Sequence, residues 1–193
     1  MGSSQADKAA SHQRIVSAAS ARVRGEGVGS LNVAELMGAA GLTHGGFYRH
    51  FDSRDELVEE AIEAALEEGA RRTARAAANG GEQALEQIIA GYLSQRHRDS
   101  PESGCAVAAL PAEVARSTER ARDAYTRQVR RYLELLTELL PARGADEHDA
   151  HLIIAALVGG LSIARAVNDE QLSQEILAGV AGALIRRIES EAR

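Results

Sequence analysis

Two helix-start signals stand on either side of one tight turn. Asn32 can accept a hydrogen bond from an unsatisfied amide at the start of a helix, and Glu35 follows three residues later. Ser53 and Glu56 repeat the same spacing. Between the two signals, Gly41-Leu42 favours a turn, because glycine readily adopts a positive φ. The segment therefore predicts two short helices, a tight turn between them and a longer helix directly after, which is a helix-turn-helix.

The rest of the chain also carries helical rather than strand signals. The 193 residues contain three prolines, and no stretch alternates β-branched and polar residues. Apolar residues instead recur at steps of three and four between glycine-rich or proline-rich breaks. These patterns predict helices at about 9–24, 32–40, 44–50, 53–79, 82–97, 106–115 (bent near Pro111), 119–140, 146–167 and 170–191. The expected fold class is all-α, with an N-terminal three-helix helix-turn-helix domain (1–53) and a six-helix body (54–193).

Composition excludes several classes of protein. A single cysteine permits no internal disulfide and fits a reducing cytoplasm. Residues 1–11 contain no apolar core of a signal peptide, and the longest apolar run, Leu152 to Ala164, is shorter than the roughly 20 residues that span a bilayer. We therefore expect a cytoplasmic protein without a membrane partner.

No motif indicates catalysis or a cofactor. There is no nucleophile with a His/Asp relay and no phosphate-binding glycine loop. His148 and His151 stand three residues apart on one helical face, but a solvated pair is the simpler interpretation than a metal site. We expect no catalytic residue, no metal and no cofactor.

Charge is distributed unevenly along the chain. The net charge is −6, which by itself disfavours nucleic acid, yet residues 1–54 carry six cationic and four acidic side chains. A small DNA-binding domain on an acidic body would show this asymmetry. Within the basic stretch Thr43 to Phe51, Phe47 and Phe51 are best explained as core residues.

The last two predicted helices are rich in glycine and alanine. Glycine inside a helix costs about 1 kcal/mol relative to alanine, so its repeated use indicates close helix contact. The contact could lie within the protein's own core, or with a second copy in a four-helix interface. We favour a homodimer through about 146–191, because a two-fold axis would present the helix-turn-helix twice.

The stretch from Ile15 to Leu57 resembles the DNA-binding domain of the tetracycline-repressor (TetR) family. The matching positions are Ile15-x-x-Ala18-Ala19, Gly27, Val33-x-x-Leu36, Ala40-Gly41-Leu42-Thr43-x-Gly45-x-Phe47-Tyr48-x-His50-Phe51-x-Ser53-Arg54-x-x-Leu57. The resemblance implies a homodimeric, ligand-responsive transcription factor, usually a repressor, that binds double-stranded DNA at a palindromic operator. One departure is Gly46 beside Gly45, which weakens the recognition helix and leaves fewer side chains to contact bases.

The resemblance assigns the DNA-binding surface to a set of residues at and after the turn. We expect Tyr48 and His50 mainly at phosphates, Arg49 and His44 at base edges, and Thr43 as helix cap with a phosphate contact. Arg54 adds charge at the start of the following helix. The DNA-binding candidates are thus Thr43, His44, Gly45, Tyr48, Arg49, His50 and Arg54.

The body carries candidates for sensing a small-molecule effector. Tyr92, Arg96, Tyr125 and Tyr132 could project into a cavity between helices, although a tyrosine on an apolar helix face is more often an edge-of-core residue. Cys105 follows Gly104 at a predicted helix start, where a thiolate is favoured, and Gly-Cys here resembles a subset of the family that includes oxidant or electrophile sensors. The alternative for Cys105 is a small buried hydrophobe. The alternative for the whole chain is a helical binding protein or enzyme without operator function.

Overall fold

The computed structural model describes residues 5–140 and 147–191, and this part of the chain contains helices and no strand. The elements are α1 (Gln5–Glu26), η1 (Val28–Ser30), α2 (Val33–Ala39), η2 (His44–Arg49), α3 (Arg54–Gly80), η3 (Gly81–Gln83), α4 (Ala84–Tyr92), α5 (Gln95–Asp99), η4 (Pro101–Ser103), α6 (Ala106–Ala109), α7 (Pro111–Val114), α8 (Glu119–Leu139), α9 (Glu147–Ala166) and α10 (Glu170–Glu191). The η elements are 3₁₀ helices. The all-α prediction is confirmed.

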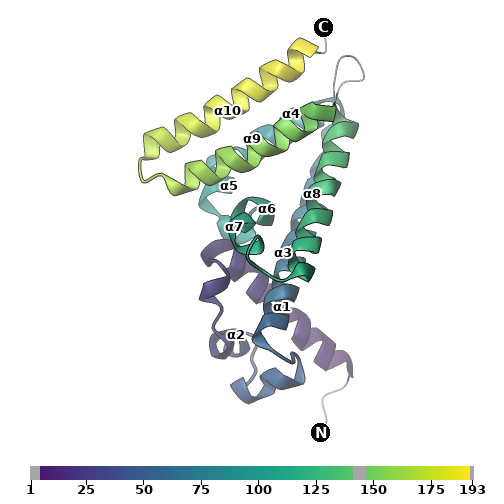
Figure 1. Ribbon diagram of the computed structural model, residues 1–193, viewed down its shortest axis with the longest axis vertical. Helices are drawn as coiled ribbons and strands as arrows, with labels where there is room; N and C mark the ends of the chain where they lie inside the picture. Colours follow the sequence, from purple (N-terminus) through teal and green to yellow (C-terminus); the bar gives the residue numbers. More distant parts are fainter. Residues whose placement is uncertain (1–4, 141–146, 192–193) are drawn as a thin grey trace.

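The N-terminal elements form a small unit at one end of the molecule (Figure 1). In this unit, α1, α2 and η2 pack around a core that includes Ile15, Met37, Phe51 and Leu57, each almost fully buried. The ring of His12 on α1 stacks on Phe51 with 4.6 Å between ring centroids. We call this unit the head.

The long helix α3 connects the head to the rest of the molecule, the body. Its packing partners are α1 in the head and α4 and α8 in the body (Figure 1). At the far end, α9 and α10 form an antiparallel hairpin, and the short helices α6 and α7 lie between this hairpin and the head. The helix α3 is continuous over 27 residues and packs in both units.

Three predicted helices differ from the observed ones. The stretch 82–97 is divided, because Ser94 Oγ accepts from the amide of His97 at 3.2 Å and starts α5. The stretch 106–115 is also two helices, separated at Leu110 and restarted by Pro111, which has no amide to donate. The segment 44–49 is a 3₁₀ helix, consistent with the weak helical preference of the Gly45-Gly46 pair. The predicted stop signals Pro141 and Gly144 and the helix start at 146 lie outside the described residues.

The helix α9 contains an apolar stretch, His148–Ala166, which is the one described helix long and apolar enough to cross a membrane. It packs against α10, α8 and α6, with Ile153, Leu157 and Leu161 buried in the body. The stretch therefore acts as a core helix of the body. The rings of His148 and His151 lie 6.4 Å apart, and no group of three or more metal-ligating side chains occurs among the described residues.

Candidate nucleic-acid interface and body cleft

The turn before η2 is fixed by local hydrogen bonds. Asn32 Oδ1 accepts from the amides of Ala34 (2.9 Å) and Glu35 (3.3 Å), so α2 starts at the predicted cap. Gly41 follows α2 with a φ of 74°, and the amide of Leu42 donates to the carbonyl of Met37 at 2.8 Å. This left-handed residue reverses the chain and directs η2 outward from the head.

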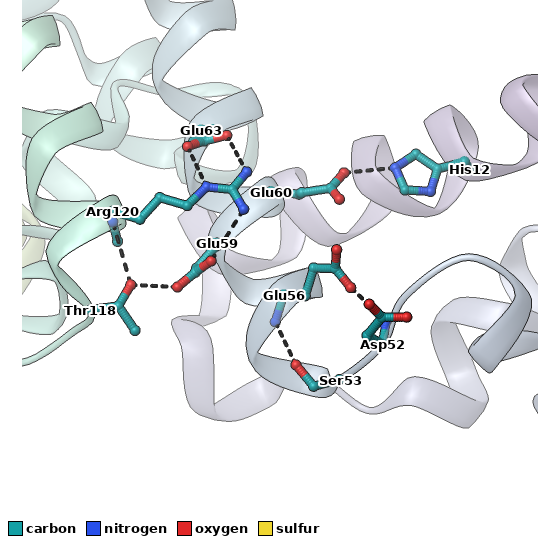
Figure 2. Close-up of polar contacts among 10 residues, drawn as sticks. His12, Asp52, Ser53, Glu56, Glu59, Glu60, Glu63, Thr118 and Arg120 are labelled. Carbon is teal, nitrogen blue, oxygen red and sulfur yellow. Dashed lines mark hydrogen bonds and ion pairs between the residues drawn. The ribbon is translucent and has the colours of Figure 1, made fainter.

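The exit from η2 is fixed in a similar way (Figure 2). Ser53 Oγ accepts from the amide of Glu56 at 3.1 Å, and Glu56 Oε2 accepts from the amide of Asp52 at 2.5 Å. The glutamate thus reaches one residue further back than in the usual capping box. Arg54 Nη2 donates to the carbonyl of Val28 at 3.1 Å, so this exposed arginine also holds η1 against the start of α3.

Between these two anchors, η2 presents a polar surface over a buried aromatic base. Phe47 and Phe51 are 3% and 1% exposed, while Tyr48 is 74% exposed. Thr43, His44, Gly45 and Arg49 are exposed, and His50 is half-buried. The phenylalanines therefore fix the orientation of η2, and its outer face offers hydroxyl, imidazole and guanidinium groups to a partner.

A hollow of about 410 Å³ lies between the start of α1 and η2, and its lining includes Lys8, Thr43, Arg49 and His50. His50 Nδ1 is buried and has no hydrogen-bond partner among the described residues. The pKa of His50 is lowered, mainly by burial and further by the positive charges of the neighbouring His12, Lys8 and Arg49. Lys8 was not predicted for this surface, because only the fold brings this residue beside η2.

The acidic face of α3 is bound from both sides by cationic or hydroxyl side chains (Figure 2). On the body side, Arg120 of α8 bonds Glu63 through two nitrogens at 3.0 Å, and a third nitrogen lies 3.3 Å from Glu59. On the head side, His12 Nε2 lies 2.6 Å from Glu60 Oε2. Neighbouring carboxylates on one helix thus join α8 and α1 to the same segment of α3.

A buried arginine joins the head to the body at a second place. Arg24, near the end of α1, donates from Nε to the carbonyl of Glu102 in η4 at 2.7 Å. Its Nη1 reaches Ser20 Oγ at 3.2 Å, and its Nη2 lies 2.9 Å from Glu68 Oε2. The guanidinium therefore links α1, α3 and η4.

The body contains a cleft of about 490 Å³ bounded by α3, α4, α8 and the segment 94–105. Its lining includes Tyr92, Arg96, Cys105 and Tyr132, which are four of the five residues proposed from sequence as sensor candidates. Tyr125 does not line this cleft. Its hydroxyl donates to the carbonyl of Val107 at 2.7 Å, and burial raises the pKa of Tyr125 to about 12.

A histidine not anticipated from sequence organises the cleft wall. His97 Nε2 accepts from the amide of Cys105 at 3.0 Å, so this nitrogen carries no proton. His97 Nδ1 therefore donates to the carbonyl of Tyr92 at 2.8 Å. Burial lowers the pKa of His97, which favours this neutral form. The ring joins the end of α4 to the residue that begins α6.

A thiol and two tyrosine hydroxyls also line the cleft. Cys105 is 6% exposed, and its Sγ lies 4.0 Å from Tyr132 Oη. Tyr92 Oη is buried with no hydrogen-bond partner among the described residues. Burial raises the pKa of both tyrosines, so both hydroxyls stay protonated at neutral pH.

Comparison with known families agrees with this architecture. Residues 15–61 match the family model of bacterial regulatory proteins of the tetR family. Residues 81–178, half of the chain, match the C-terminal domain of LmrA/YxaF-like transcriptional regulators. The chain therefore belongs to the TetR family of DNA-binding transcriptional regulators, which are not enzymes. Members bind DNA operators and dimerise. A search of curated proteins found no matching sequence.

Solved structures of TetR-type regulators share the fold at low sequence identity. The reduced form of NemR from E. coli is 19% identical, with 93% of this chain and 97% of that chain covered and a TM-score of 0.75. A TetR-family regulator from Agrobacterium tumefaciens is also 19% identical, with 94% and 98% covered and a TM-score of 0.76. RolR in complex with resorcinol is 16% identical, with 97% and 91% covered and a TM-score of 0.55.

Proposed function

We propose that this regulator is a cytoplasmic homodimeric repressor that releases a palindromic operator when a small molecule occupies the body cleft. In this proposal residues 1–53 bind DNA, and residues 54–193 bind the effector and form the dimer. The observation that carries the proposal is the position of the segment 100–105. Ser100, Ser103, Gly104 and Cys105 line the cleft, while the carbonyl of Glu102 accepts the hydrogen bond from Arg24 of the head.

The DNA contacts follow from the exposed face of η2. Arg49 and His44 would reach base edges, and Tyr48, Thr43 and His50 would contact phosphates. The hollow beside η2 supports the phosphate contacts, because Lys8 and Arg49 supply positive charge to it. Two heads would occupy half-sites one helical turn apart, about 34–36 Å.

The dimer interface would be the outer face of the α9–α10 hairpin. Leu152 and Ile163 of α9 and Leu172 of α10 are large apolar side chains that remain 46%, 54% and 43% exposed. On the same two helices, an added Cβ at Gly159 or Gly179 would meet no atom within 4 Å, so both glycines have open space beside them. Exposed apolar side chains next to small residues allow two hairpins to pack closely into a four-helix interface.

Control of the head would pass through the hydrogen bonds of the segment 100–105. On the cleft side, Arg72 Nη1 donates to the carbonyl of Ser103 and His97 accepts from the amide of Cys105. On the head side, Arg24 holds the carbonyl of Glu102. A ligand shifts a conformational equilibrium when it binds one conformation more tightly than the other. A molecule that fits the cleft only when the segment 100–105 has moved would therefore stabilise the moved conformation, together with the head position that accompanies it.

Chemical modification of Cys105 is a second candidate trigger. The thiol lines the same cleft and lies near the Tyr132 hydroxyl, so an added group on sulfur would occupy effector space. RolR with resorcinol bound supports a small-molecule effector, and NemR, solved in a reduced form, supports a redox trigger. Operator release by an oxidant or electrophile, measured with the wild type and Cys105→Ser, separates the two, because equal release from both proteins would exclude the thiol.

The experiment that tests operator binding uses duplexes selected by the protein from a random pool and measures binding by fluorescence anisotropy at two salt concentrations. We expect a palindromic consensus, and loss of the complex in a Tyr48→Ala/Arg49→Ala double variant. Arg71→Ala, an exposed arginine in the middle of α3, is the matched control and should bind like the wild type. A protein that selects no consensus would instead be a helical binding protein without operator function.

A further inference from the structure

The mouth of the body cleft is positively charged although the protein as a whole is acidic. Arg72 and Arg96 line the cleft, and no aspartate or glutamate does so within the described part of the chain. Arg96 is exposed and forms no ion pair there. Arg72 lies 3.6 Å from Glu68, but that carboxylate also lies 2.9 Å from Arg24 and is shared between the two arginines. The mouth therefore holds positive charge that its own carboxylates do not balance.

A third arginine adds positive charge behind the cleft wall. Arg165 of α9 donates to the carbonyls of His97 (2.6 Å) and Arg98 (3.1 Å), and it forms no ion pair with any carboxylate that the structure describes. It lies directly behind Gly104, since a Cβ on that glycine would be 2.8 Å from Arg165 Nη2. Because Arg165 is half-buried, water screens its charge less than at the surface.

The rest of the cleft lining is less polar than the two arginines. It includes Tyr92 and Tyr132, and the Tyr92 hydroxyl has no hydrogen-bond partner among the residues that the structure describes. These tyrosines, with Thr73 and Ile88, also line a small adjoining hollow whose remaining walls are aliphatic: Leu135, Leu136, Ile154, Leu157 and Val158. The cleft therefore combines cationic, hydroxyl-bearing and apolar side chains in one lining.

We propose that the effector of this regulator is an amphipathic organic monoanion, a carboxylic acid with an apolar body. Its carboxylate would accept hydrogen bonds from Arg72 and Arg96, which are suited to planar two-oxygen anions. Its apolar body would lie in the cleft against Ile88, Tyr92 and Tyr132. The cleft volume is within the range of small-molecule sites. The regulatory consequence of binding rests on the function proposed above, but the binding itself does not.

The test is isothermal titration calorimetry on the DNA-free protein with octanoate as the probe. Octan-1-ol and octylamine replace the carboxylate with a neutral and a cationic group, and butyrate shortens the apolar body. We expect octanoate to bind about tenfold or more tightly than octan-1-ol, as a charge-assisted hydrogen bond allows, and octylamine and butyrate to bind more weakly still. Octanoate binding should also weaken as salt is raised.

Two variants test whether the preference for octanoate over octan-1-ol depends on an arginine of the cleft. Arg96→Gln removes an exposed charge that has no hydrogen bond or ion pair with the described residues, so it should weaken octanoate binding about tenfold and leave octan-1-ol unchanged. Arg71→Gln should leave both affinities unchanged, because Arg71 is the neighbour of Arg72 in sequence but does not line the cleft. Thermal unfolding of each variant confirms that it is folded.

Three outcomes overturn the proposal: equal affinity for octanoate and octan-1-ol, octanoate binding that Arg96→Gln does not change, and no octanoate binding at all. Octanoate that binds through Arg96 but does not release the operator would support the assigned ligand class and contradict the proposed release. The two proposals can therefore fail separately.

Discussion

Replacing Arg24 with methionine removes the buried guanidinium that joins α1 to η4. The 2.7 Å hydrogen bond to the carbonyl of Glu102 is charge-assisted, and such bonds contribute about 1.5–3 kcal/mol. The pair with Glu68 adds under about 1 kcal/mol, because the glutamate is 46% exposed. Methionine keeps the buried aliphatic part of the side chain. We therefore expect Arg24→Met to lower the free energy of unfolding by roughly 2–4 kcal/mol.

The assay is urea unfolding followed by circular dichroism, with Arg22→Met as the control. Arg22 lies two residues earlier on α1 and pairs with Glu26 and Glu35 at the surface, so its replacement should cost far less. Loss of the Arg24 link should also reduce effector-driven operator release under conditions in which the variant is still folded. An Arg24→Met protein as stable as Arg22→Met, and equally responsive to effector, would refute the assignment of Arg24 as a link between cleft and head.

Three further predictions concern the turn, the cleft wall and the dimer. Gly41→Ala should cost about 1–2 kcal/mol of unfolding free energy in urea, because its φ is 74°, whereas Gly45→Ala, with open space and no positive φ, should be neutral or stabilising. Folding lowers the pKa of His97, so its neutral form stabilises the fold above about pH 6.5 and this stabilisation is lost as the pH falls further. Thermal unfolding between pH 5 and 8 should therefore depend less on pH in His97→Phe. Ile163→Glu should sediment as a monomer, and an unchanged dimer would exclude the outer face of α9 as the interface.

The features of the head that depend only on residues close together in the sequence could be predicted accurately. The caps at Asn32 and Ser53 and the turn at Gly41 each depend on residues within four positions, and all three are observed. The exposed and buried faces of η2 follow from the same local pattern. Lys8 could not be assigned to this surface, because its position beside η2 depends on how α1 packs against the head.

In the body, the spacing of apolar residues is not sufficient to predict where helices end or which polar residues line a cleft. Apolar spacing through Tyr92 predicted one helix, but the Ser94 hydroxyl caps a new helix and outweighs the continuing pattern. The sensor candidates were chosen as polar residues on apolar helix faces, which fits both a cleft residue such as Tyr132 and a core residue such as Tyr125. Only the tertiary hydrogen bond to Val107 distinguishes them. His97 could not be predicted because both of its partners are backbone groups outside its own helix.

Acidic and basic side chains are concentrated in different parts of this protein. The acidic face of α3 is paired with Arg120 on one side and His12 on the other, so α3 is held by both the body and the head. The positive groups of the cleft and of η2 lie at opposite ends of this acidic segment. An acidic net charge is therefore compatible with binding anions at two separate sites.

The most direct test of operator binding through η2 is the salt dependence of binding to a selected palindromic duplex. We expect log K to fall linearly with log salt, and Lys8→Ala, in the hollow beside η2, to reduce the slope by about one per head, or about two for the dimer. Arg49→Ala, at a base edge, should instead reduce the preference for the palindrome over a scrambled duplex. Arg71→Ala should leave the slope unchanged. A palindrome preference that Arg49→Ala does not alter, or equal affinity of the wild type for a palindrome and a scrambled duplex, would contradict operator recognition through η2.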